Sequence, residues 1–366
     1  MDRRIELRQL TEILALFLIV QFLGLAIIFF SVPPWAISLV TAPVSTSTSI
    51  SQVAELLVYM IAASIILVVI FRVYKGAILF KALEAYVVGV PSFFLFLILI
   101  GDFAPTLSAT ASMVVAAALS IALVYAKSRK PWLRNTTTII SSIGMGIIIG
   151  MFGFSFGYFL MALIAVYDYV AVFITKHMQV MARALASRNL SFLIGSSDIS
   201  LVPENTIPRR DRPDAMKAAA ELGKRNPSIE KFVKAGTVPM VSQVMLGAGD
   251  LAIPLMLAVS AYISFGDFFV PLVIACGAAA GVLGTMYLLK KYMVPLPAIP
   301  PLFAFINAAL AIALFIKPSI MPGISPLAFL ALAVMILLLL YFTLERHPLR
   351  SEEPSSGSGR RKPRHA

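Results

Sequence analysis

Long apolar segments alternate with short polar connections along most of this chain. Their lengths match the roughly 17–25 residues that a helix needs to cross the hydrocarbon core of a bilayer. Transmembrane barrels alternate apolar and polar residues instead, and that pattern is absent. The sequence therefore predicts an all-α polytopic membrane protein. Its ten predicted spans are residues 12–30, 52–71, 82–100, 110–126, 136–153, 156–175, 240–263, 268–289, 300–316 and 325–344.

One polar connection is much longer than the others and divides the chain into four parts. Residues 1–175 hold six predicted spans, 176–239 form the long connection, 240–344 hold four spans, and 345–366 form a low-complexity basic tail. The connection begins with KHMQVMARALASRNL, which predicts a helical extension of span six along the membrane face. We interpret the remainder as a solvated connector, the alternative being a plug or gate over a site between spans six and seven. The tail is expected to be disordered.

Composition and charge agree with a membrane protein and give it an orientation. Apolar residues make up 59 % of the chain and charged residues 13 %, with a mean hydropathy of +0.91, whereas soluble domains average roughly 45–50 % apolar and 25 % charged. Of the 30 Lys and Arg, all but Lys317 fall on one side of the predicted spans. The positive-inside rule therefore puts the N-terminus, the long connection and the tail in the cytoplasm. The net charge of +12 is then explained by topology and by contact with anionic lipid, without nucleic acid.

Several classes of chemistry have no matching residues. The three histidines (His177, His347, His365) are scattered and lack the spacing of metal ligands. The sequence contains no phosphate-binding loop, zinc motif or serine-nucleophile elbow. The single cysteine, Cys276, lies in an apolar run and is predicted to be a small core residue. We therefore expect neither a metal nor a cofactor.

Two carboxylates lie well inside apolar spans. They are Asp168 in LIAVYDYVAVF and Asp250 in LGAGDLAIP. Asp168 precedes Lys176, at the end of span six, by eight residues, or about 12 Å at the rise of a helix. Asp250 comes ten residues after the predicted start of span seven near 240, or about 15 Å. On neighbouring antiparallel spans, acids at such similar depths can face each other.

The interiors of the spans carry no Lys or Arg that could neutralise these acids. Two close carboxylates in a medium of low dielectric constant cannot both ionise easily, so we expect the pair to share one proton. Such a pair can hydrolyse a peptide bond: one carboxylate takes a proton from the attacking water, and the other donates a proton to the developing oxyanion. Because the pair titrates as a unit, neither acid is given a fixed role. Intramembrane acids also suit the proton carriers of transporters.

Small and proline residues accompany the acids. Gly247 and Gly249 allow the close approach of a substrate or of the facing span, although small residues are also ordinary in membrane-helix packing. Residues 294–302, VPLPAIPPL, predict extended backbone before span nine, because proline lacks an N–H and disfavours helix in the preceding residue. This segment could pair with a substrate unwound into a strand. The alternative is a proline-rich interfacial turn.

Three short motifs resemble those of the presenilin and signal peptide peptidase family of intramembrane aspartic proteases. That family has Y-D in its sixth span, G-x-G-D in its seventh and P-A-L at the start of its ninth. The resemblance covers residues 1 to about 317, with Ile299 where the family usually has leucine. The corresponding residues here are Tyr167-Asp168, Gly247-Ala248-Gly249-Asp250 and Pro297-Ala298-Ile299.

The resemblance implies roles and an architecture. Asp168 and Asp250 would be the catalytic pair, and Tyr167 would lie beside the site. Residues 297–299 would bind substrate and shape the centre. The fold would be a presenilin-like bundle of nine transmembrane helices, to which this sequence adds a predicted tenth at 325–344. Presenilins act within a multi-subunit secretase, whereas this chain looks like the small microbial, archaeal-type homologues that lack those subunits.

The sequence thus predicts an intramembrane aspartic endopeptidase that cleaves single-span membrane proteins near the cytoplasmic side. Its partners would be transmembrane substrates and the lipid bilayer, and we expect it in a prokaryotic cell membrane. The alternatives are a proton-coupled transporter or leak channel that uses the same acids, and a chaperone-like scaffold with an inactive pair. No inverted repeat relates the two groups of spans, which counts against the transporter.

Overall fold

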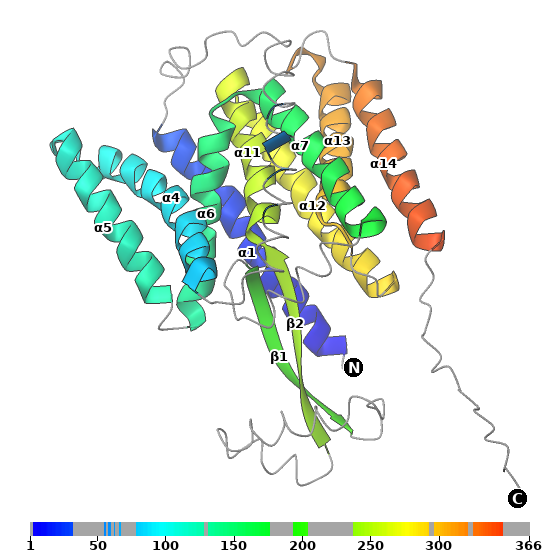
Figure 1. The fold of residues 1–366 in the computed structure, drawn as a ribbon. Coiled ribbons are helices and arrows are strands. Elements are labelled where there is room, and N and C mark those ends of the chain that lie inside the picture. The colour runs from blue at the N-terminus through cyan, green and yellow to red at the C-terminus, as the bar shows by residue number, and fades with distance from the viewer. Residues whose placement is uncertain are drawn as a thin grey trace, which may run out of the picture.

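The computed structural model describes residues 3–31, 78–127, 131–175, 193–203, 237–292, 296–320 and 325–346, with single positions 55, 58, 59, 62 and 66. Within these ranges the chain forms nine α-helices and one β-hairpin (Figure 1). Eight of the nine helices are long and apolar enough to cross a membrane, and the ninth, α6, opens with the polar sequence PWLRNTTT. The elements are α1 (Arg3–Ser31), α4 (Ile78–Phe103), α5 (Ala109–Lys127), α6 (Pro131–Gly150), α7 (Phe154–Tyr169), β1 (Leu193–Pro203), β2 (Thr237–Gly247), α11 (Ala248–Phe265), α12 (Phe269–Tyr292), α13 (Ile299–Ile316) and α14 (Pro326–Arg346).

Most predicted spans are confirmed as helices, including the one at 325–344, which corresponds to α14. The predicted span at 52–71 lies outside the described residues apart from the single positions given above. The predicted helical extension over 176–190 and the tail at 345–366 also lie outside them, except for the end of α14. The full count of ten spans therefore stays a prediction.

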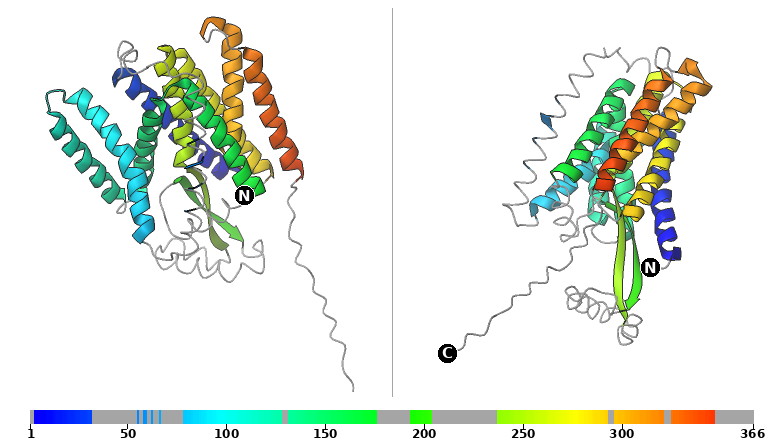
Figure 2. Two further views of the ribbon diagram at one scale, coloured as in Figure 1. Left: turned by 45° about the horizontal axis from the view of Figure 1, so that its top comes forward. Right: turned by 90° about the vertical axis from the view of Figure 1, so that its right-hand side faces the viewer.

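The β-hairpin is a departure from the predicted all-α fold. Strands β1 and β2 pair in antiparallel register from Leu193 opposite Gly247 to Pro203 opposite Thr237. The helix predicted from residue 240 therefore begins only at Ala248, because residues 240–247 belong to β2. This stretch, MVSQVMLG, is a short apolar run with β-branched valines, and periodicity alone cannot distinguish a strand from a helix in such a run. The hairpin projects from one end of the bundle (Figures 1 and 2).

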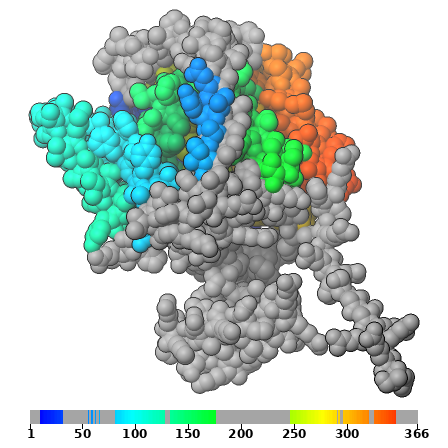
Figure 3. Space-filling model, in the orientation of Figure 1, coloured from blue at the N-terminus to red at the C-terminus, as the bar shows by residue number. Residues whose placement is uncertain are grey.

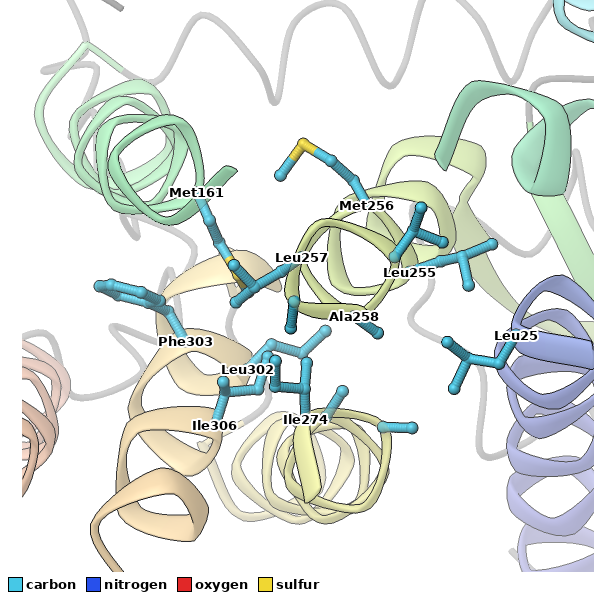
Figure 4. Packing of buried hydrophobic residues seen from close by; sticks show 14 of the residues in the cluster. Leu25, Met161, Leu255, Met256, Leu257, Ala258, Ile274, Leu302, Phe303 and Ile306 are labelled. Carbon is cyan, nitrogen blue, oxygen red and sulfur yellow. The ribbon is translucent and has the colours of Figure 1, made fainter. Parts of the chain in front are cut away.

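Helix α11 lies at the centre of the bundle and is surrounded by α1, α6, α7 and α12. Buried residues occur all around it, as expected for a helix without an exposed face. Figure 4 shows Leu255, Met256, Leu257 and Ala258 of α11 among side chains of the surrounding helices. Those side chains come from α1, α7, α12 and α13, and include Leu25, Met161, Ile274, Leu302, Phe303 and Ile306.

The outer helices present apolar faces, which suit contact with lipid. Helices α5 and α14 form opposite flanks of the molecule (Figure 3), and Val334, Leu338 and Phe342 of α14 are exposed. Cys276 is exposed on α12, so the prediction that it is a core residue is wrong. An apolar run in a membrane protein can face either protein or lipid, and among the described elements α12 packs against α1, α11 and α13.

Candidate active site

Asp168 lies in the last turn of α7, and its side chain is buried, with 7 % exposed. Directly after Tyr169 the chain changes from an α-helix to a π-helical turn, Val170–Ile174. The N–H of Thr175 donates to the carbonyl of Val170 at 2.9 Å, which is the spacing of a π-helix. Such turns are rare and occur frequently at functional sites. Local sequence pattern does not predict this π-helical turn, which begins two residues after Asp168.

The start of α13 supplies a hydrogen bond to Asp168. The backbone N–H of Ile299 donates to Oδ2 of Asp168 at 3.2 Å, and the backbone of Ala298 also contacts this carboxylate. The first N–H groups of a helix have no partner within the helix. Pro300 and Pro301 carry no N–H, so Ile299 provides the available donor in this part of the first turn. The nonhelical backbone predicted before span nine is present at residues 296–297, and Pro297 is buried.

Asp250 is the third residue of α11 and lies in its first turn. Its Oδ2 accepts a hydrogen bond from the backbone N–H of Gly247, the N-cap residue, at 3.1 Å. This is the acidic half of a capping box, and the first turn of a helix favours negative side chains. The sequence predicted Asp250 in the middle of a helix that began near residue 240. It lies instead at the junction of β2 and α11, because the preceding residues form a strand.

Side chains from two other helices hold this first turn of α11. The hydroxyl of Ser142 on α6 donates to the carbonyl of Ala248 at 3.2 Å. The side-chain amide of Gln21 on α1 donates to the carbonyl of Leu251 at 2.9 Å. Gln21 is fully buried, and its Oε1 has no hydrogen-bond partner among the described residues. Neither residue was predicted from the sequence, although a lone Gln within the apolar run LIVQFLGL is a recognisable exception.

The fold places one acid in the last turn of α7 and the other in the first turn of α11. Helices α7, α11 and α13 pack against one another in the pairs α7–α11 and α7–α13, so the acids come from adjacent helices. Over the described ranges, no Lys or Arg forms a salt bridge with either acid. The same residues contain no group of three or more His, Cys, Asp or Glu that could hold a metal ion.

The other predicted site residues lie around this pair. Tyr167 precedes Asp168 in α7 and is half-buried. A Cβ on Gly247 would meet Oδ2 of Asp250 at 3.1 Å, so this glycine makes room for the carboxylate itself. Gly249 is exposed, and a Cβ there would meet no atom of the described chain within 4 Å. No described span approaches Gly249 closely, and open space lies beside the first turn of α11, so the close approach of a substrate there stays a prediction.

Comparisons with known proteins give one family. The sequence model described as "Signal-peptide peptidase, presenilin aspartyl protease" matches residues 14–324. Among solved structures, that of a presenilin family intramembrane aspartate protease matches with 18 % sequence identity and a TM-score of 0.46. That match covers 81 % of this chain and 97 % of the other. A search of curated proteins finds no match.

Proposed function

This chain belongs to the signal-peptide peptidase and presenilin aspartyl protease family, and we propose that it hydrolyses single-span membrane proteins with Asp168 and Asp250 as its catalytic pair. Membership makes it an aspartic endopeptidase of the membrane, a multi-pass protein whose substrates are membrane proteins. The identity of the catalytic pair, the single-span substrates and a cut near the cytoplasmic side are our proposal.

The observation that carries the proposal is the placement of two acids on the packed helices α7 and α11, with no basic partner in the described chain. Close carboxylates in a medium of low dielectric constant hold one proton between them. The ionised member takes a proton from a water molecule as the water oxygen attacks the peptide carbonyl carbon. The protonated member gives its proton to the carbonyl oxygen. Collapse of this intermediate breaks the C–N bond, and a proton passes to the leaving nitrogen.

Two stretches of nonhelical backbone near the acids support binding of the substrate in an unwound, extended form. A transmembrane substrate enters as a helix, which shields its peptide bonds, so it has to unwind before it is cut. Residues 296–297 are nonhelical and lead into the turn that contacts Asp168, and β2 ends at Gly247, three residues before Asp250. Strand β1 lies against α1 and α6, so the edge turned away from these helices belongs to β2. We propose that the unwound substrate adds to this edge as a further strand.

The distribution of charge supports a cytoplasmic position for the hairpin. The N-terminal end of α1, the hairpin and the last turn of α14 lie at the same end of the bundle (Figure 1). The opposite end includes Lys317, whose Nζ lies 3.8 Å from Oδ2 of Asp267 in the turn between α11 and α12. With all other Lys and Arg predicted on the hairpin side, the positive-inside rule supports a cytoplasmic hairpin.

A cleavage assay with matched variants tests this function. Purified protein in bilayers is given a single-span substrate, and the products are mapped by mass spectrometry. We expect Asp168→Asn and Asp250→Asn to abolish cleavage. Asp267→Asn, which alters an exposed aspartate at the far end, should leave cleavage unchanged. A hydroxyl-bearing mimic of the tetrahedral intermediate should inhibit the parent protein. Cleavage that survives either of the first two substitutions would exclude the pair, and proton flux without cleavage would favour a transporter.

A further inference from the structure

Helix α14 contacts the helix that carries Asp168, yet it lies outside the matched family region. That match ends at residue 324, and α14 begins at Pro326. Helix α14 packs along α13 (Figure 2) and reaches α7 at two levels. The rings of Phe329 and Tyr158 meet edge to face, with centroids 5.6 Å apart. Further along both helices, the phenol of Tyr169 lies 2.6 Å from Oγ1 of Thr343.

The order of the contacts shows that α7 and α14 run in the same direction. On α7 the contacts are 11 residues apart, from Tyr158 to Tyr169, and on α14 they are 14 residues apart, from Phe329 to Thr343. These separations correspond to roughly 17 Å and 21 Å of helix. Phe329 is 6 % exposed, so the first contact is a buried packing contact. The second contact is polar, and its residue on α7, Tyr169, directly follows Asp168 in the sequence.

The polar contact has a defined direction. Oγ1 of Thr343 also lies 2.6 Å from the carbonyl oxygen of Leu339, which can only accept a hydrogen bond. The threonine hydroxyl therefore donates to Leu339, and its oxygen accepts from the phenol of Tyr169. The ring of Tyr169 also contacts Phe173, a residue of the π-helical turn, with centroids 5.2 Å apart. Tyr169 thus connects α14 with the turn that follows Asp168.

The position of that turn decides where Asp168 points. Each residue of an α-helix is rotated by about 100° from the previous one. A π-helical turn accommodates an extra residue. If the turn moved to the other side of Asp168, the carboxylate would rotate by roughly 100° relative to the helices around it. It would then leave the N–H of Ile299, its partner at the start of α13.

We propose that Tyr169 is a positioning residue, held by Thr343 of α14, which keeps the π-helical turn behind Asp168 and the carboxylate directed at the start of α13. Helix α14 is then an addition to the family fold that stabilises the catalytic geometry. This inference rests on the proposed catalytic role of Asp168.

Single and double variants test the contact. Thr343→Val keeps the shape of the side chain without its hydroxyl, Thr343→Ser keeps the hydroxyl, and Tyr169→Phe removes the phenol oxygen. We expect Thr343→Val and Tyr169→Phe each to lower kcat roughly three- to tenfold, the range for loss of one uncharged hydrogen bond. KM should stay unchanged, Thr343→Ser should retain the parent kcat, and the double variant should be no slower than the single ones. Tyr341→Phe, at an exposed tyrosine of α14, is the matched control.

A second measurement separates positioning from general stability. Backbone amides of residues 170–175 should exchange hydrogen faster in Thr343→Val, at an unchanged melting temperature. The inference is overturned if kcat is unchanged in both single variants, if their losses multiply in the double variant, or if activity only follows the melting temperature. Asp168→Asn is assayed in parallel. Cleavage by that variant would refute the proposed function. If it is inactive while Thr343→Val and Tyr169→Phe keep full kcat, only the positioning inference fails.

Discussion

The backbone N–H of Ile299 donates a hydrogen bond to Oδ2 of Asp168 across 3.2 Å and joins the first turn of α13 to the last turn of α7. The two residues are 131 positions apart in the sequence. Because prolines follow at 300 and 301, Ile299 carries the available N–H in this part of the turn. The orientation of the acid therefore depends on a backbone group rather than on a side chain.

Removal of this N–H should impair cleavage. Ile299→Pro deletes the donor and also disfavours the helical backbone of Ala298, which has φ −83° and ψ −37°. A hydrogen bond to a charged group contributes about 1.5–3 kcal/mol, so we expect kcat/KM to fall roughly ten- to hundredfold. Ile299→Leu keeps the N–H and the volume and should stay within about threefold of the parent. Full activity of the proline variant would show that the bond does not hold the acid in its working position.

The shared proton predicts a bell-shaped dependence of kcat/KM on pH. At acidic pH both carboxyls are protonated, and neither can take a proton from water. At alkaline pH both are ionised, and neither can protonate the carbonyl oxygen. Activity should therefore fall on both sides of a maximum while the melting temperature shows that the protein stays folded. A rate that is flat over this range, at constant folded fraction, would contradict a monoprotonated pair.

The two glycines before Asp250 should respond differently to alanine. In Gly247→Ala the new Cβ would lie 3.1 Å from Oδ2 of Asp250, so the carboxylate has to shift and kcat should fall several-fold. In Gly249→Ala the Cβ meets no described atom within 4 Å. Because alanine favours helix by about 1 kcal/mol over glycine, that variant should melt at the same temperature or slightly higher.

A substrate that approaches α11 through the open space at Gly249 would meet the added methyl group. Gly249→Ala should then raise KM while leaving kcat close to that of the parent. Steady-state kinetics on one substrate, with melting temperatures of both variants, distinguish these effects. Parent-like KM in Gly249→Ala would indicate that the substrate approaches from another side.

Close packing of α12 on α13 predicts a sensitive glycine outside the three motifs. A Cβ on Gly281 would lie 2.7 Å from Cα of Leu302, in the first turn of α13. Backbone has to move to relieve this contact, so Gly281→Ala should lower the free energy of unfolding by about 1–3 kcal/mol. It should also reduce cleavage, because the same turn carries Ile299. Gly101→Ala, with no atom within 4 Å of its Cβ, is the control and should melt no lower than the parent. Equal melting temperatures for both variants would contradict the packing.

Much of the fold could be predicted because each membrane span appears in the sequence as a continuous run of apolar residues. Helix α12, predicted at 268–289, is found at Phe269–Tyr292, and α14, predicted at 325–344, is found at Pro326–Arg346. The hairpin was not predicted because its strands gain their hydrogen bonds from each other across residues 204–236. That long-range pairing converts residues 240–247 from the predicted start of a helix into a strand.

For the candidate site, the two acids could be predicted from the sequence, but the polar residues on neighbouring helices could not. Asp168 and Asp250 stood out because ionisable residues inside apolar spans are expensive and rare. Gln21, Ser142 and Thr343 are ordinary polar residues, and their importance arises only from what they contact. Their partners are a carbonyl on another helix for the first two and the phenol of Tyr169 for the third. The local sequence pattern around a residue does not show which group on another helix it will contact.

The sequence by itself determined that the chain crosses the membrane repeatedly, which acids lie in apolar segments, and the order of the three motifs around them. These follow from hydropathy and residue type, which act over a few neighbouring positions. Only the tertiary structure decided that Asp250 lies in the first turn of α11, that Ile299 rather than a side chain meets Asp168, and that α14 reaches Tyr169. N–H groups and carbonyls at helix ends have no partner within the helix, so their hydrogen-bond partners depend on which groups helix packing places next to them. That packing is a property of the whole bundle.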